Sequence, residues 1–149
     1  MKDIRQWDIG MVDGVFSISK IRVRYADTDQ MRIVYYGKYF EYFEEGRSDF
    51  FRLIELSYSE IEKNGIALPV VEAKASYKKP AKYDDLLEVK TILSELPMAR
   101  IKLNYEIRID GSQKIIAEGF TEHAFIDLKN NKTTRAPKSL LDTLKKYFK

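Results

Sequence analysis

Two aspartates stand one residue apart in the stretch RYADTDQMRIVYYGKY, residues 24–39, just before a pattern typical of an amphipathic helix. The first amides of that helix, around Val34 to Gly37, would have no partner within it and would carry the positive end of its dipole. A carbonyl oxygen bound there would be polarised. A carboxylate beside the carbonyl carbon would then act as a nucleophile or as a general base on water. The spacing suits acyl transfer, but Asp27 and Asp29 could equally shape a turn or cap the helix.

The chain offers few residues for other kinds of catalysis. One histidine and no cysteine exclude disulfides, thiol catalysis and cysteine-ligated metals. We expect no metal site, because zinc would need almost only carboxylate ligands. The sequence also lacks the glycine motifs of phosphate loops and nucleophile elbows. His123 lies in an apolar strand pattern, so we expect it to be buried, neutral and bonded to backbone or a hydroxyl rather than catalytic.

The composition is typical of one soluble globular domain. The 149 residues are 44% hydrophobic, carry a net charge of +3 and contain no linker or internal repeat, so we expect a single domain over 1–149. No apolar run reaches the ~18 residues of a membrane span, and the N-terminus is too polar for a signal peptide. We therefore expect a cytoplasmic protein without a membrane partner. The short basic stretches argue against nucleic acid as a partner.

The periodicity of apolar residues predicts the elements that position the two aspartates. Residues 15–25 alternate with a phase slip near Ser19, which predicts a strand with a bulge or bend. One long helix is expected from about Tyr36 to Leu56, ending before a turn. Its apolar positions are Tyr39, Phe40, Phe43, Phe50, Phe51 and Ile54. Four strands in hairpin connections should follow, within 66–79, 86–96, 100–109 and 114–128.

This order of elements predicts an α+β architecture. An antiparallel sheet with one solvated face would wrap its other face around the aromatic helix. Small side chains on the last strand, including Ala117 and Gly119, would let the helix approach closely. Residues 1–13 are expected to be an irregular segment. Pro137 is expected to start a short C-terminal helix over 137–148.

Residues 23–52, VRYADTDQMRIVYYGKYFEYFEEGRSDFFR, resemble the signature of the 4-hydroxybenzoyl-CoA thioesterase family of hotdog-fold proteins. The later segments YKKPAKYDDLLEV and AEGFTEHAFIDLKNNKTTRAP are similar to further parts of the family pattern, in the same order. The similarity covers about residues 20–140. It implies the hotdog fold, an antiparallel five-stranded sheet wrapped around one long central helix. It also implies hydrolysis of an acyl-CoA thioester to a free acid and CoA.

The resemblance also implies a set of site residues. The family's catalytic aspartate matches Asp29, and the residue whose backbone N–H polarises the carbonyl matches Tyr36. Whether Asp29 attacks the carbonyl or activates water is left open. The implied substrate-binding residues are Arg32, Val34, Tyr35, Gly37, Lys78, Lys79 and Lys82. The lysines would meet the phosphates of CoA as point charges, or would only form a solvated edge. No bound cofactor is implied, because CoA is part of the substrate.

Two positions near the expected site depart from the family pattern, and two positions on the helix match it. Arg32 stands where the family has Gly, so it either alters the loop backbone or places a cation at the mouth of the site. Lys38 stands where the family has Asn or Ser. Glu44 and Arg47 match the family pattern, and their i, i+3 spacing predicts a structural ion pair.

Two other functions of hotdog domains compete with a thioesterase. A hotdog domain that binds acyl-CoA without turnover, as a sensor or partner protein, is one alternative. The hydratase branch of the fold is excluded, because it needs a histidine five residues after the aspartate, where this chain has Val34. The family's members form dimers with sheets joined edge to edge, and often tetramers, with sites at subunit interfaces. A homodimer or homotetramer is therefore implied, and acyl carrier protein is left open as a donor because it presents the same phosphopantetheine arm.

Overall fold

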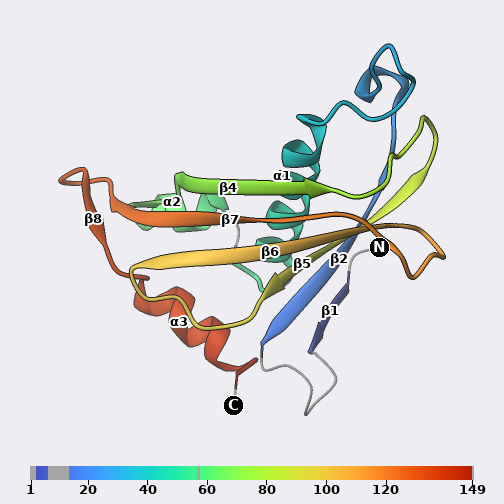
Figure 1. The fold of residues 1–149 in the computed structure, drawn as a ribbon. Coiled ribbons are helices and arrows are strands. Elements are labelled where there is room, and N and C mark those ends of the chain that lie inside the picture. The colour runs from blue at the N-terminus through green and yellow to red at the C-terminus, as the bar shows by residue number, and fades with distance from the viewer. Residues whose placement is uncertain (1–2, 7–13, 57, 149) are drawn as a thin grey trace.

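The computed structural model of the chain describes residues 3–6, 14–56 and 58–148. An antiparallel sheet curls around one long helix, α1 (Lys38–Leu53), as Figure 1 shows. The long strands are β2 (Val15–Arg22), β4 (Val70–Tyr77), β5 (Leu86–Leu93), β6 (Arg100–Ile109) and β7 (Ile115–Asp127). The predicted α+β class, with five main strands around a central helix, is confirmed.

Shorter elements complete the described part of the chain. They are β1 (Asp3–Gln6), η1 (Tyr25–Asp27), α2 (Tyr58–Lys63), β3 (Ile66–Ala67), β8 (Lys132–Thr134) and α3 (Lys138–Lys145). Strand β1 was not predicted; it lies in the segment 1–13 expected to be irregular, and the rest of that segment lies outside the described residues. Helix α2 was not predicted either, because only a turn was expected there. The C-terminal helix is confirmed, with Pro137 at its N-cap and Leu140 and Leu144 buried. Within the described ranges, no helix combines the length and the apolar composition that crossing a membrane requires.

The strand order corrects the predicted hairpins. The sheet runs β1-β2-β5-β6-β7, and β3, β4 and β8 each pair with β7. The chain therefore crosses from β4 at one edge to β5 in the middle, and no hairpin joins these two strands. Alternation identifies a strand and its buried face, but it does not identify the neighbouring strand. β4 is left at an edge, where most of its side chains are exposed.

Strand β2 has no bulge, contrary to the prediction. Its register with β5 is continuous from Val15 to Arg22. Ser17 and Ser19 are fully buried, and the Ser19 hydroxyl donates a 2.7 Å hydrogen bond to Asp49 of α1. The apparent phase slip arose because two serines occupy positions that face the core.

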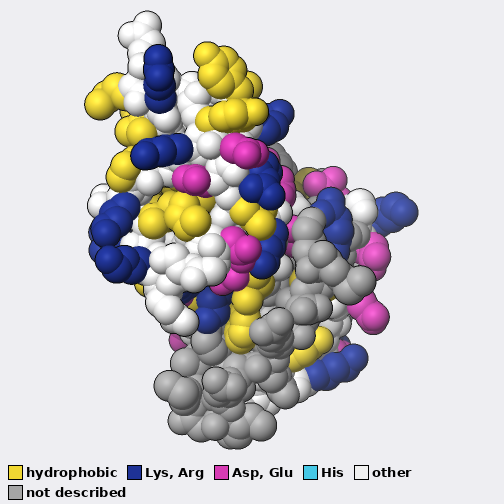
Figure 2. Space-filling model, turned by 90° about the vertical axis from the view of Figure 1, so that its right-hand side faces the viewer, with side chains coloured by type: hydrophobic (Ala, Val, Ile, Leu, Met, Phe, Trp, Pro, Cys, Tyr) yellow, Lys and Arg dark blue, Asp and Glu magenta, His cyan; other side chains and the backbone are white. Residues whose placement is uncertain are grey.

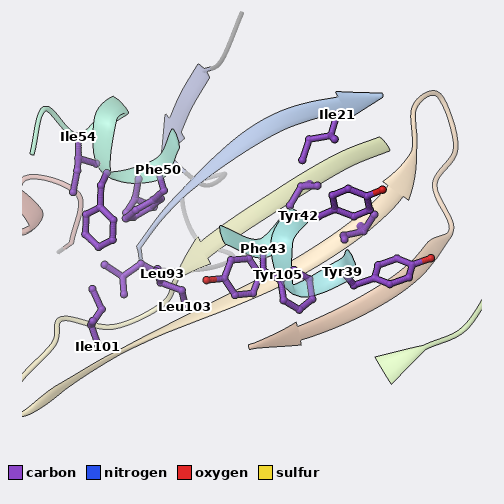
Figure 3. Close-up of a cluster of buried hydrophobic side chains, with 14 of the residues drawn as sticks. Ile21, Tyr39, Tyr42, Phe43, Phe50, Ile54, Leu93, Ile101, Leu103 and Tyr105 are labelled. Carbon is purple, nitrogen blue, oxygen red and sulfur yellow. The ribbon is translucent and has the colours of Figure 1, made fainter. Parts of the chain in front are cut away.

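The aromatic face of α1 forms the centre of the core (Figure 3). Phe43 stacks on Tyr105 of β6 with 4.4 Å between ring centroids. A Cβ atom added at Gly119 of β7 would lie 2.9 Å from the Phe43 ring, so the small residue does permit the close approach that the sequence predicted. Phe40 was expected on this face but is partly exposed, and Tyr42 is buried in its place.

A chain of buried hydrogen bonds crosses the core beside the helix. The Leu68 carbonyl can only accept, so it takes its 3.1 Å bond from Nδ1–H of His123. In a neutral ring Nε2 then accepts from the Thr121 hydroxyl at 2.9 Å. Thr121 in turn lies 2.6 Å from the Tyr105 hydroxyl, which accepts from Arg47 Nη1 at 3.2 Å. His123 is thus the buried, structural histidine that was predicted.

The Arg47 contact corrects a second prediction. Arg47 is buried and bonds inward to Tyr105, whereas Glu44 is exposed on the outer face of α1. No ion pair between these two side chains is present in the described part of the chain. The helix rotates Arg47 toward the sheet, which i, i+3 spacing alone does not reveal.

Folding stability should fall between pH 7 and pH 5 because of His123. Burial, with a smaller effect of the Arg47 charge, lowers its pKa from 6.5 to about 4. The unfolded chain therefore binds a proton more readily than the folded one, so stability present above pH 6.5 is lost as the pH falls toward 4. We expect the free energy of unfolding to fall by about 2 kcal/mol between pH 7 and pH 5. Urea unfolding at pH 7, 6 and 5 measures it.

The matched control is His123→Gln, which removes the titrating group. The variant should be less stable at pH 7 but should lose much less stability on acidification. Parallel pH curves for the two proteins would contradict the role of His123.

Candidate active site

The loop between η1 and α1 holds Asp29 in a tight turn. The Arg32 amide donates to the Asp29 carbonyl at 2.9 Å, and the Asp29 amide donates to the Ile33 carbonyl at 2.9 Å. Arg32 has a φ of +67°, the left-handed conformation that glycine adopts most easily. The cost is roughly 1 kcal/mol. Arg32 therefore adopts the left-handed backbone conformation itself, and its side chain is exposed.

The carboxylate of Asp29 is partly engaged by this turn. Its Oδ1 accepts a 2.8 Å hydrogen bond from the Met31 amide. Turn formation, the simpler role considered for this residue, is therefore present. The side chain is only partly buried, and it lines two clefts. Its position thus allows chemistry in addition to the turn.

Two backbone amides just before α1, those of Tyr36 and Gly37, have no hydrogen-bond partner among the described residues. The helix begins at Lys38, and the preceding Gly37 already has helical backbone angles. The Tyr35 amide donates to the Asp27 carbonyl, and the Lys38 amide donates to the Tyr35 carbonyl. For the amides of Tyr36 and Gly37, the described residues provide no acceptor within hydrogen-bonding distance. They are the unpartnered donors that a helix N-terminus presents.

A cleft of about 330 Å³ brings the aspartate and this helix end together. It is lined by Asp29, Ile33, Val34, Tyr36, Tyr39, Tyr77, Lys78, Lys79 and Pro80. The Tyr77 hydroxyl, at the end of β4, donates to the Tyr36 carbonyl at 3.1 Å. Burial and the neighbouring Tyr36 raise the pKa of Tyr77, which keeps it a neutral donor. The cleft is therefore lined by the carboxylate residue Asp29, by Tyr36 with its unpartnered amide, and by a mainly apolar wall.

The family assignment follows from a comparison over most of the chain. A family model described as the thioesterase-like superfamily matches residues 23–144. This chain belongs to that superfamily. The family and the hotdog fold expected from the motif at 23–52 are confirmed.

Individual proteins similar to this chain are also named as thioesterases. Acyl-CoA thioesterase YbgC of Haemophilus influenzae is 31% identical over 131 residues, 87% of this chain and 94% of that protein. A DHNA-CoA thioesterase from Staphylococcus aureus has a TM-score of 0.75 at 34% identity, over 80% of each chain. Slr0204, a 1,4-dihydroxy-2-naphthoyl-CoA thioesterase from Synechocystis, has a TM-score of 0.79 at 26% identity, over 86% of this chain and 94% of the other.

The structure brings some of the predicted site residues together and separates others. Asp29, Val34, Tyr36, Lys78 and Lys79 all line the 330 Å³ cleft. The residues outside its lining are Arg32, Tyr35, Gly37 and Lys82. The Tyr35 ring packs against the Tyr36 ring with 4.5 Å between centroids. Lys82 is exposed, and its backbone forms an isolated antiparallel bridge with the cleft residue Ile33.

Three cleft residues were not predicted from the sequence: Ile33, Tyr77 and Pro80. Tyr39, an expected apolar position of the helix, lines the cleft and also joins the core. Tyr77 ends a strand, but its place beside the helix start depends on the pairing of β4 with β7. No local signal predicts that pairing. Pro80 belongs to the segment YKKPAK, whose lysines were predicted to bind substrate. That segment was the sequence signal from which Pro80 could have been predicted.

The lysines of the cleft differ in their surroundings. Lys78 forms a 3.1 Å ion pair with Glu118, and both side chains are about half exposed. Such a surface pair contributes little, about 0–1 kcal/mol, so an anionic ligand can compete for Lys78. No ion pair of Lys79 is found within the described ranges. In the same ranges, no three His, Asp or Glu side chains cluster as metal ligands would.

A second cleft, of about 570 Å³, lies on another side of Asp29. It is lined by Tyr25, Ala26, Thr28, Asp29, Gln30, Tyr35 and Lys38. Lys38 Nζ lies 3.2 Å from Glu41 and 3.8 Å from Asp27. The departure from the family pattern at Lys38 thus places a cation, already paired, in this more polar cleft.

Large apolar side chains are exposed near the loop that carries Asp29. Tyr25 is 79% exposed, Met31 77% and Tyr83 59%, and the rings of Tyr25 and Tyr83 meet edge to face. Figure 2 shows hydrophobic side chains interspersed with Lys and Arg at the top of the view. The surroundings of the cleft therefore combine apolar and cationic groups, which suits an amphiphilic anionic ligand.

Proposed function

We propose that this protein hydrolyses acyl-CoA thioesters to a free acid and CoA, with Asp29 as nucleophile or general base and the Tyr36 amide as oxyanion donor. The thioesterase class follows from membership of the superfamily. One observation supports the residue assignment: Asp29 and Tyr36, whose backbone amide has no acceptor among the described residues, line the same cleft just before α1. The named relatives act on acyl-CoA thioesters, which supports the substrate class.

In the proposed reaction the thioester oxygen accepts a hydrogen bond from the Tyr36 amide. Negative charge that develops on this oxygen meets a donor already in place, a contribution of about 100-fold or more in kcat. If Asp29 attacks, it forms an anhydride with the acyl group, CoA leaves as the thiolate, and water then cleaves the anhydride. If Asp29 is a base, water attacks the thioester carbon directly, its proton passes to the carboxylate, and the C–S bond breaks so that CoA leaves as the thiolate. In either case the Met31 amide holds one carboxylate oxygen and leaves the other to react.

The remaining lining residues divide between the two ends of the substrate. Ile33, Val34, Tyr39 and Pro80 offer an apolar wall for the acyl group. Lys78 and Lys79 offer cations for the phosphates of CoA. Arg32 and Lys82, which are exposed outside the lining, stay predicted contacts for the nucleotide end. Acyl carrier protein stays an alternative donor, and a bound cofactor is not required by the reaction.

The test is release of free thiol from short, long and aromatic acyl-CoAs by the purified chain, with binding measured on the same compounds by calorimetry. Turnover of at least one of these compounds is the expected result. Tight binding of acyl-CoA without any thiol release would instead support the alternative of a non-catalytic acyl-CoA-binding domain.

We also propose that two copies pair through β4 into one continuous sheet. This strand is an open edge with exposed Val70, Val71 and Tyr77, and such edges are templates for pairing. A two-fold axis at Ala73 in an antiparallel pair would set Glu72 of each copy opposite Lys74 of the other. Glu72→Lys should therefore weaken the dimer roughly tenfold, because it creates two like-charge contacts per dimer. Sedimentation equilibrium measures the effect.

The charge swap Glu72→Lys with Lys74→Glu is the control, because it restores opposite charges across the same axis. It should recover the affinity of the wild-type dimer. A monomeric wild type, or a swap as weak as the single variant, would contradict pairing in this register.

A further inference from the structure

Asp27, the first aspartate of the pair, is buried and fully engaged by hydrogen bonds. It is 2% exposed. Its Oδ2 accepts from the Arg24 amide and from the Tyr42 hydroxyl, each at 3.0 Å. Its Oδ1 lies 3.2 Å from Arg24 Nη2 and 3.8 Å from Lys38 Nζ. Burial acts to raise the pKa of this carboxyl, but the hydrogen bonds from Arg24 and Tyr42 outweigh it and hold the pKa below its usual value.

The main chain of Asp27 is tied to the other end of the same loop. Its carbonyl accepts the Tyr35 amide at 2.9 Å. Thr28 and Val34 form an isolated antiparallel bridge just inside this contact. The loop is thereby closed at its base, with Asp29 two residues after Asp27 and Tyr36 one residue after Tyr35.

The side chain of Asp27 also connects this closed loop to the long helix. Tyr42 belongs to α1 and is 5% exposed, so its ring is part of the buried core. Its bond to Asp27 is a buried, charge-assisted contact, the stronger kind of hydrogen bond. One residue therefore links the loop with Asp29, the segment with the Tyr36 amide and the helix that follows.

We infer that Asp27 is a positioning residue for thioester hydrolysis: it holds the Tyr36 amide and Asp29 at the mutual placement that the reaction needs. This inference rests on the proposed function of those two groups. Displacements of about 1 Å away from a reacting centre can cost 100-fold in rate. Loosening the anchor should lower kcat more than it changes KM, because Tyr39, Pro80 and the lysines of the cleft lie outside the anchored loop.

A purely structural role makes a different prediction. An anchor that only stabilises the fold would reduce the free energy of unfolding and leave kcat of the folded enzyme unchanged. Two variants test the anchor from its two sides. Asp27→Asn keeps the shape and removes the charge, and Tyr42→Phe removes only the hydroxyl on α1. Tyr147→Phe is the matched control, because it removes a tyrosine hydroxyl in the C-terminal segment, outside both clefts.

At a temperature well below unfolding, Asp27→Asn and Tyr42→Phe should each lower kcat at least about tenfold with KM within about threefold. Tyr147→Phe should match the wild type. The kcat of the double variant should lie within about threefold of that of the slower single variant, because both changes disrupt the same hydrogen bond between Tyr42 and Asp27. Wild-type kcat in both single variants would overturn the inference.

A second measurement does not depend on turnover. Hydrogen exchange of the Tyr35 amide, which bonds to the Asp27 carbonyl, should be at least about tenfold faster in Asp27→Asn and in Tyr42→Phe, while amides within β6 keep their rates. Unchanged exchange at Tyr35 would overturn the inference. A wild type that releases no thiol would contradict the proposed function, and the exchange rates would then still decide whether Asp27 holds this segment.

Discussion

Asp29→Asn is expected to lower kcat for thiol release at least about 100-fold and to leave KM within a few-fold. An amide neither attacks a thioester nor accepts a proton from water, so both proposed roles of Asp29 are lost. The turn should survive, because the side-chain oxygen of asparagine can still accept from the Met31 amide. Steady-state thiol release, with the unfolding temperature as a check on folding, measures the effect.

Asp84→Asn is the matched control for that experiment. Asp84 is exposed in the loop after Tyr83, outside both clefts, and its φ of +71° is a conformation that asparagine tolerates. The same change of charge there should leave kcat unaltered. If Asp29→Asn kept more than about a third of wild-type kcat, Asp29 would be neither nucleophile nor base.

Gly119→Ala is expected to reduce the free energy of unfolding by more than about 3 kcal/mol. The added Cβ would overlap the main-chain oxygen of Lys74 in β4 and lie 2.9 Å from the Phe43 ring. Neither obstacle can move cheaply: the first is part of the β4–β7 ladder, and Phe43 is stacked on Tyr105. Urea unfolding followed by circular dichroism measures the loss.

Gly37→Ala adds the same methyl group at a position where the neighbouring side chain, Tyr35, can move. Its Cβ would meet the ring of Tyr35 at 2.8 Å, but that side chain is 45% exposed and can turn away. The φ of −66° suits alanine, so the cost should stay below about 1 kcal/mol. Equal losses in the two variants would show that the contact at Gly119 is not the cause.

Displacement of β4 should also affect the cleft. Tyr77 ends this strand and donates to the Tyr36 carbonyl, so a shifted β4 removes a wall residue and a contact to the helix start. Gly119→Ala protein that stays folded at low temperature should therefore hydrolyse more slowly than Gly37→Ala.

The sequence by itself determined the features that depend on neighbouring residues. Strict alternation in β6 predicted Ile101, Leu103, Tyr105, Ile107 and Ile109 to face inward; the first four are buried, and Ile109 packs partly buried against the core. Aromatic residues at helical spacing predicted α1, and the motif before it predicted the family and the loop that carries Asp29. These signals are local, because a pleated strand and a helix each set which residues share a face.

Only the tertiary structure decided which elements are neighbours and which polar groups are buried. The pairing of β4 with β7, which brings Tyr77 to the cleft, follows from the closure of the whole sheet. Ser17 and Ser19 lie in the core because α1 packs over them, although their polarity indicated the opposite face. Asp27 and Asp29 have the same chemistry and differ only in burial and partners. Periodicity specifies a face but not the residues across it, so the distinct roles of the two aspartates depend on contacts between distant parts of the chain.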